Sequence, residues 1–186
     1  MWALAGVTLT PWRKYGLGME SGLAALRVLV VDDNAQMRSI VGTVLAAAGI
    51  RQLHYATGGR QGLKAVAAFK PDVCYVDCEM SDVNGLDFIS AVRALDTAAR
   101  QLPLIMLTGH SDLTHLNAAR DRGVTEFLTK PVTARTILTR LQAVIDQPRP
   151  FIDTPAYVGP DRRRRRLACG DAPKRRRTDS TDACEL

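Results

Sequence analysis

The stretch RVLVVDDN, which runs from Arg27 to Asn34, decides the fold of this chain. Its apolar run, Val28 to Val31, lacks the polar alternation of a half-exposed strand. Such a run is typical of a strand that is buried on both faces of a parallel sheet. The acidic pair Asp32 and Asp33 follows directly, and Asn34 is a residue type that favours the N-cap of a helix. The stretch therefore predicts a buried strand that passes through an acidic turn into a helix.

The same alternation continues through the middle of the chain. Apolar runs predict five strands, at residues 27–31, 53–56, 73–77, 104–108 and 126–129. After each run, apolar residues recur at the three- and four-residue spacing of an amphipathic helix. Leu86, Ile89 and Val92 show this spacing after the third strand. Five consecutive strand–helix units predict an α/β fold, a doubly wound five-stranded parallel sheet with helices on both faces.

Chemically active side chains stand where the predicted strands end. Asp32 and Asp33 follow the first strand, Asp77 ends the third, Thr108 ends the fourth and Lys130 follows the fifth. Because ligands bind at the carboxyl ends of parallel strands, we expect these residues to converge at one edge of the sheet. Three neighbouring carboxylates repel one another unless a cation lies among them, and Mg²⁺ prefers oxygen ligands of this kind. A carboxylate can also accept a phosphoryl group, which Lys130 and Thr108 would then contact, and the central strand makes Asp77 the best-placed acceptor.

Four motifs, in this order, resemble the receiver domain of two-component response regulators. They are VLVVDDN from Val28, YVDCEMSDVNG from Tyr75, MLTG from Met106 and FLTKP from Phe127. Each motif alone is weak, but the four in order on predicted strand ends are specific. The resemblance covers about residues 26–147, and it implies a flavodoxin-like fold of the CheY-like receiver type.

The resemblance also implies roles for the residues at the strand ends. Asp77 would be the phosphoacceptor, and Thr108 and Lys130 would contact its phosphoryl group. Phe127 takes the place of the switch aromatic, which moves together with Thr108. The Mg²⁺ ligands that the resemblance implies are Asp32, Asp33, Asp77 and the backbone carbonyl of Glu79.

The partners implied by the resemblance are a sensor histidine kinase or phosphotransfer protein, which supplies the phosphoryl group, and a downstream protein target. No enzyme output domain is recognisable in the sequence, so we expect the chain to act as a switch and not as an enzyme. Two positions depart from the family pattern. Ser81 stands where a proline usually follows the methionine, and Asn84 stands where an aspartate usually precedes Gly85.

The composition indicates a globular core with charged appendages. Hydrophobic residues make up 46% and charged residues 24% of the chain. The formal net charge of +6 is concentrated in residues 161–177, which hold nine Lys and Arg against two Asp. We expect an N-terminal extension over 1–23, a receiver domain over 24–147 and a Pro/Arg-rich basic tail, largely disordered, over 148–186. No uncharged apolar run is long enough to span a membrane, and four scattered cysteines without a C-x-x-C pair favour the cytoplasm.

Three alternatives stand beside this interpretation. The basic run from Arg162 to Arg177 favours binding to nucleic acid or another anionic surface. In that alternative the chain is a regulator in which the receiver controls binding by the basic tail. A metal-dependent phosphohydrolase with Asp77 as nucleophile is disfavoured, because such enzymes usually carry a second Asp where this chain has Glu79. A third alternative is a receiver-like module that binds a partner without being phosphorylated. Such a module would lack one of the residues of the phosphorylation site, and none of them is missing from this sequence. At the N-terminus, Met19 is an alternative start to Met1.

Overall fold

The structure, a computed structural model, describes residues 23–109 and 113–163 of the 186-residue chain. Its centre is a parallel sheet of five strands in the order β2-β1-β3-β4-β5, which confirms the predicted architecture. The strands are β1 (Arg27–Val31), β2 (Gln52–Ala56), β3 (Val73–Asp77), β4 (Leu104–Thr108) and β5 (Glu126–Thr129). The register sets Val31 beside Val76 and Asp77 beside Leu107, so the carboxyl ends of the central strands lie level with one another.

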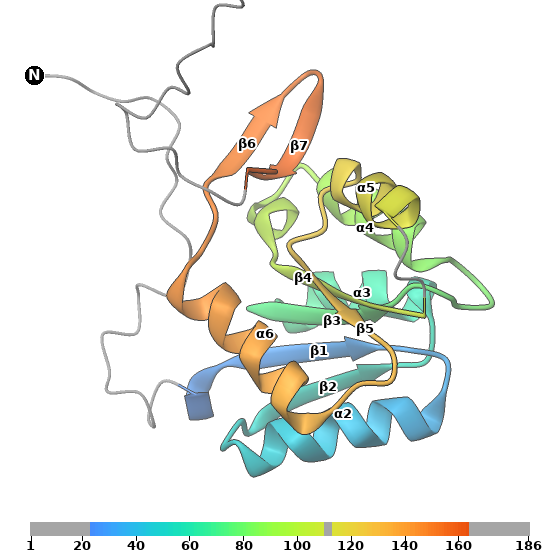
Figure 1. Cartoon of the computed structure of the whole chain (residues 1–186), viewed down its shortest axis with the longest axis vertical. Helices are drawn as coiled ribbons and strands as arrows, with labels where there is room; N and C mark the ends of the chain where they lie inside the picture. The colour runs from blue at the N-terminus through green and yellow to red at the C-terminus, as the bar shows by residue number, and fades with distance from the viewer. Residues whose placement is uncertain (1–22, 110–112, 164–186) are drawn as a thin grey trace, which may run out of the picture.

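Helices cover both faces of this sheet (Figure 1). Two helices pack on one face, namely α2 (Ala35–Ala47) and α6 (Ala134–Asp146). Three pack on the other face, namely α3 (Gly59–Phe69), α4 (Gly85–Arg93) and α5 (Leu113–Asp121). A 3-10 helix, η2 (Ala98–Gln101), connects α4 to β4. None of the helices in the described ranges is long and apolar enough to cross a membrane.

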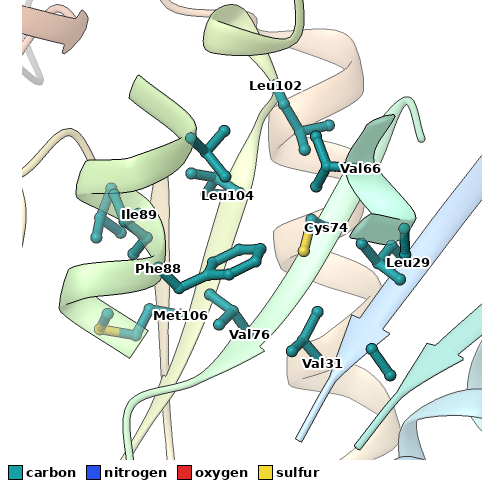
Figure 2. Packing of buried hydrophobic residues seen from close by; sticks show 14 of the residues in the cluster. Leu29, Val31, Val66, Cys74, Val76, Phe88, Ile89, Leu102, Leu104 and Met106 are labelled. Atoms are coloured by element: carbon teal, nitrogen blue, oxygen red, sulfur yellow. The ribbon is translucent and has the colours of Figure 1, made fainter. Parts of the chain in front are cut away.

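Two hydrophobic cores follow from the apolar strands, because consecutive side chains of a strand point to opposite faces. One core lies between the sheet and helices α3, α4 and α5, where Phe88 of α4 packs among Val76, Met106 and other strand residues (Figure 2). The other core lies between the sheet and helices α2 and α6. In this second core, the buried Tyr75 hydroxyl donates to the carbonyl of Ile137 at 3.0 Å, which ties the central strand to α6.

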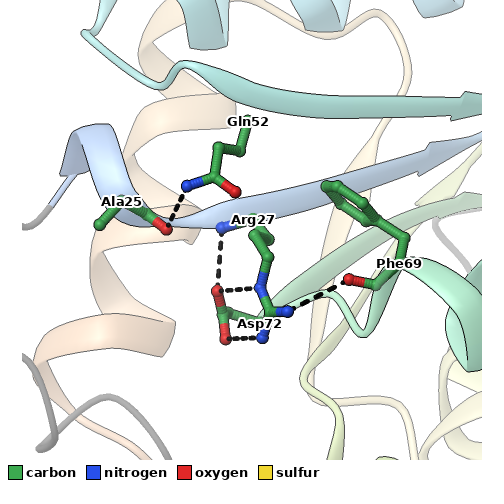
Figure 3. A network of polar contacts seen from close by, with 5 residues as sticks. All are labelled: Ala25, Arg27, Gln52, Phe69 and Asp72. Carbon is green, nitrogen blue, oxygen red and sulfur yellow. Dashed lines mark hydrogen bonds and ion pairs between the residues drawn. The ribbon is translucent and has the colours of Figure 1, made fainter.

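A polar clamp joins the strands at the end of the sheet where they begin (Figure 3). The backbone N–H of Arg27 donates to Asp72 at 2.9 Å, and the Arg27 guanidinium pairs with the same carboxylate at 3.4 Å. The guanidinium also donates to the carbonyl of Phe69 at 3.3 Å. The side-chain amide of Gln52 donates to the carbonyl of Ala25 at 3.3 Å. These contacts hold the starts of β1, β2 and β3 together, at the edge opposite to the predicted site.

The folded part of the chain extends beyond the boundary that the sequence analysis predicts at Gln147. Two short strands, β6 (Phe151–Thr154) and β7 (Tyr157–Pro160), form an antiparallel hairpin where a largely disordered tail is predicted. The hairpin stands at the top of Figure 1, near α4 and α5. The remainder of the predicted tail, residues 164–186, and residues 1–22 of the predicted N-terminal extension lie outside the described residues.

Contacts with distant parts of the chain explain why this hairpin forms. Asp153 of β6 pairs with Arg100 of η2 at 2.9 Å. Gly123, just before β5, has a positive φ of 91° and lies so close to β7 that a Cβ there would be 2.8 Å from the Val158 carbonyl oxygen. A side chain at Gly123 would therefore strain the backbone and collide with the hairpin. Because these partners lie far away in sequence, the local sequence of residues 151–160 does not reveal them.

Candidate functional site

The predicted acidic residues meet at the carboxyl edge of the sheet. Asp32 and Asp33 follow β1, and Asp77 is the last residue of β3. Each offers a carboxylate oxygen to a group in which these atoms all lie within 4.8 Å of one another. Asp32 and Asp77 are buried, whereas Asp33 is exposed. The carboxylates come together because β1 pairs directly with β3, so that the two strands end side by side.

The ends of β4 and β5 complete this edge. Thr108, the last residue of β4, is buried, and its carbonyl accepts a hydrogen bond from the backbone N–H of Lys130 at 2.8 Å. The Lys130 side chain turns toward the acidic group, where its Nζ lies 2.7 Å from Asp77 Oδ1. The structure thus gathers the predicted carboxylates, hydroxyl and ammonium at one edge of the sheet.

Asp32 is held by its own loop. The backbone N–H of Asn34 donates to Asp32 Oδ1 at 2.8 Å, and the Asn34 side chain caps α2 by accepting from the N–H groups of Gln36 and Met37. The Arg38 guanidinium donates to the Asp32 carbonyl at 2.7 Å. Within the described residues, Asp32 Oδ2 is buried without a hydrogen-bond partner. A buried oxygen of this kind, beside two further carboxylates, suits a hard divalent cation such as Mg²⁺.

Burial raises the pKa of Asp32 from the usual 3.8 to about 6. The negative charges of Asp77 and Asp33 act in the same direction, whereas the N–H of Asn34 and the ammonium of Lys130 lower this pKa. Either a proton or a metal cation relieves the cost of burying the charge. The donor set therefore fits Mg²⁺, which the carboxylates of Asp32, Asp33 and Asp77 could hold.

Without metal, the contribution of Asp32 to the stability of the protein should fall as the pH rises through the range in which this carboxyl group ionises. Folding raises the pKa of Asp32 from 3.8 to about 6, so the folded state binds more protons between these values. By linkage, ionised Asp32 lowers the free energy of unfolding by roughly 3 kcal/mol above the folded-state pKa, and this cost vanishes below the unfolded-state pKa. Urea unfolding in EDTA should show Asp32→Asn gaining stability over the wild type as the pH rises. A difference that does not change with pH would contradict this prediction.

Three further residues border the edge. The Glu79 side chain is exposed, and the predicted role of its backbone carbonyl in Mg²⁺ binding stays a prediction. Phe127 of β5 is half-buried and packs against the core beneath α3, α4 and α5, and its predicted role as switch aromatic also stays a prediction. Burial and the charge of Asp77 raise the pKa of the Cys78 thiol, although a hydrogen bond with Thr108 lowers it. The thiol therefore stays neutral at physiological pH and adds no charge beside Asp77.

Two further groups that shape the site do not follow from the sequence motifs. One is the guanidinium of Arg38, which contacts the backbone of Asp32. The other is the backbone N–H of Ser81, which donates to Asp33 Oδ2 at 2.9 Å. Neither contact belongs to a motif of side chains. The sequence signals only that Ser81 departs from the family pattern, and this departure does not identify Asp33 as the partner of its N–H group.

The first residues of the predicted basic run contact the folded part of the chain. Arg162 pairs with Asp121 at the end of α5 at 2.5 Å, and its guanidinium lies 4.6 Å from the centre of the Tyr157 ring. The backbone N–H of Arg163 donates to Asp161 at 3.0 Å. Residues 164–177 lie outside the described residues, so binding of nucleic acid or another anionic surface through this run stays a prediction.

Residues 28–142 match the family model of the response regulator receiver domain. The chain is 30% identical over 121 residues to the chemotaxis protein CheY1 of Helicobacter pylori (strain J99). The matched region covers 64% of this chain and 97% of that protein. Among solved structures, the chemotaxis response regulator CheY4 of Vibrio cholerae matches with 31% identity and a TM-score of 0.60, over 64% of this chain and 98% of that one. The receiver domain of the sensor histidine kinase PA1611 from Pseudomonas aeruginosa has a magnesium ion coordinated in its active-site cleft. It shares the fold at 22% identity and a TM-score of 0.60, over 66% of this chain and 98% of that one.

Proposed function

This chain belongs to the response regulator receiver domain family, and on that premise we propose that it is a phosphoacceptor switch in a two-component or phosphorelay system. A phosphohistidine of a sensor histidine kinase or phosphotransfer protein is the donor, and Asp77 is the acceptor. The observation that carries this proposal is the ion pair of the buried Asp77 with Lys130, at 2.7 Å, inside the acidic group. This pairing supports the proposal, because a carboxylate oxygen beside an ammonium group could attack phosphorus while the cation neutralises the incoming phosphoryl group.

The proposed transfer is a displacement at phosphorus. An Asp77 carboxylate oxygen forms the new P–O bond while the P–N bond to the donor histidine breaks, and the leaving imidazole nitrogen keeps the electron pair of that bond and takes up a proton from water. Lys130 neutralises one phosphoryl oxygen, and the Thr108 hydroxyl donates to another. Mg²⁺, when held by the three carboxylates and the Glu79 carbonyl, supplies the remaining charge neutralisation. Water later attacks the phosphorus, which releases phosphate and restores the free carboxylate.

The proposed output is a change in a protein-binding surface. Phosphorylation adds negative charge and acceptor oxygens at Asp77. Lys130 and Thr108 contact these oxygens, and the two residues stand at the ends of β5 and β4. Because the contacts differ between the two states of Asp77, they bias the conformations of the neighbouring segments. A movement of the half-buried Phe127 would then reshape the surface of α5, β5 and α6, to which the downstream protein target binds.

Incubation of the purified chain with acetyl phosphate tests this function. We expect the intact mass to rise by one phosphoryl group in the presence of Mg²⁺ and to stay unchanged in EDTA, because uncompensated carboxylates repel the phosphate donor. Absence of any mass gain in Mg²⁺, with the protein folded by circular dichroism, would contradict the proposed function. An equal gain in EDTA would contradict the role of the metal.

A further inference from the structure

A direct hydrogen bond joins the two loops that form the acidic group. The backbone N–H of Ser81, in the loop between β3 and α4, donates to Asp33 Oδ2 at 2.9 Å. Asp33 belongs to the loop after β1, and it is the exposed member of the group of three carboxylates. The bond therefore restrains the one carboxylate of the three that burial does not hold in place.

The loop that carries this N–H is itself firmly anchored. The Asp82 carboxylate accepts from the backbone N–H groups of Arg60 and Gly59, at 3.0 and 2.8 Å, at the start of α3. These bonds lower the pKa of Asp82. The loop closes where the N–H of Gly85 donates to the carbonyl of Cys78 at 2.9 Å. The Ser81 N–H is thus fixed relative to both β3 and α3, and it gives Asp33 a rigid point of attachment.

We propose that the backbone N–H of Ser81 positions Asp33 for the metal that the three carboxylates hold, an inference that rests on the proposed function. Repulsion from Asp32 and Asp77 favours a conformation of Asp33 that points out into water. The N–H group opposes this rotation without adding a charge. A carboxylate has about four lone-pair sites, so one donor at Oδ2 leaves the others available to a cation. Asp33 is therefore ordered before the metal arrives, which lowers the entropy cost of binding.

The donor is a backbone group, so the decisive comparison is between proline and any other residue at position 81. Proline has no N–H and cannot make this bond. The family pattern usually has proline here, whereas this chain has Ser81. The departure from the pattern thus gives this chain a link between its two metal-site loops that a proline would remove.

Titration with Mg²⁺ alone, followed by amide chemical shifts, tests the inference in the wild type, Ser81→Pro and Ser81→Ala. We expect Ser81→Pro to raise the dissociation constant for Mg²⁺ roughly fivefold, as the loss of one modest hydrogen bond would. Ser81→Ala keeps the N–H and should bind Mg²⁺ as the wild type does. In an Asp33→Ala background the proline should have no further effect on Mg²⁺ affinity, because the acceptor is gone.

Two outcomes would overturn the inference: equal Mg²⁺ affinity in the wild type and Ser81→Pro, or an equal loss in Ser81→Ala. A wild-type chain that binds no Mg²⁺ would instead contradict the proposed function, so the two failures are distinguishable. If Ser81→Pro does not fold, hydrogen exchange of the Ser81 amide tests the inference in its place. This amide should exchange more slowly in the wild type than in Asp33→Ala, and equal rates would overturn the inference.

Discussion

Asp77→Asn should take up no phosphoryl group from acetyl phosphate under conditions that phosphorylate the wild type. The substitution preserves the size of the side chain but replaces the attacking carboxylate by an amide, which is not a nucleophile at neutral pH. It also removes the ion pair to Lys130, at 2.7 Å, and one of the three carboxylates that could hold Mg²⁺. We expect the loss to be complete by intact-mass spectrometry, and the affinity for Mg²⁺ to fall with it.

Asp72 provides a matched control for Asp77. It is also buried, but it precedes β3 and pairs with Arg27 at 3.4 Å, at the opposite edge of the sheet. Asp72→Asn should keep its phosphoryl uptake, because nothing at the carboxyl edge changes. A phosphoryl gain in Asp77→Asn would place the modification on another residue. Equal loss in both variants would indicate damage to the fold and not the loss of an acceptor.

Much of the fold and of the candidate site was predictable because both depend on short stretches of sequence. The run Val28 to Val31 is apolar at every position, and all four side chains are fully buried between two layers of helices. Once five such strands are assigned to a parallel sheet, topology alone brings their carboxyl ends together. For this reason Asp32, Asp77 and Lys130, which lie far apart in the chain, could be predicted as neighbours without knowledge of any distance.

Contacts between atoms that no pattern specifies were not predictable. The hairpin of β6 and β7 consists of strands of four residues, which are too short for a periodicity to stand out. Its formation depends on a close approach to Gly123, a residue whose sequence neighbourhood indicates only the end of a helix. The Ser81 bond to Asp33 involves a backbone donor, which every residue except proline possesses. In each case the determining factor is a distance between segments, and local propensity carries no information about it.

The contacts of Arg93 could not be predicted from the local sequence either. This charged residue is buried at the end of α4. Only 4% of its surface is exposed. Its Nε and Nη2 donate to the carbonyl of Gly123 at 3.0 and 2.8 Å, and its Nη1 donates to the carbonyls of Arg100 at 2.6 Å and Leu102 at 2.8 Å. Its guanidinium lies 5.6 Å from the centre of the Phe151 ring in β6. Burial lowers the pKa of Arg93 to about 10, so the side chain stays charged at neutral pH and joins α4, η2 and the hairpin.

Arg93→Met should therefore lower the free energy of unfolding by roughly 4 kcal/mol, since each carbonyl left without a donor in a buried position costs about 1–3 kcal/mol. Urea unfolding measures this loss, and hydrogen exchange of the β7 amides should show the hairpin opening more readily. Arg122→Met is the control, because Arg122 is exposed and its guanidinium contacts Asp87 at 2.9 Å and the Ser90 hydroxyl at 3.4 Å at the surface. That variant should lose less than about 1 kcal/mol. Equal losses in the two variants would contradict the role of Arg93. Faster exchange confined to the hairpin, with unchanged global stability, would mean that the guanidinium serves the hairpin and not the sheet domain beneath it.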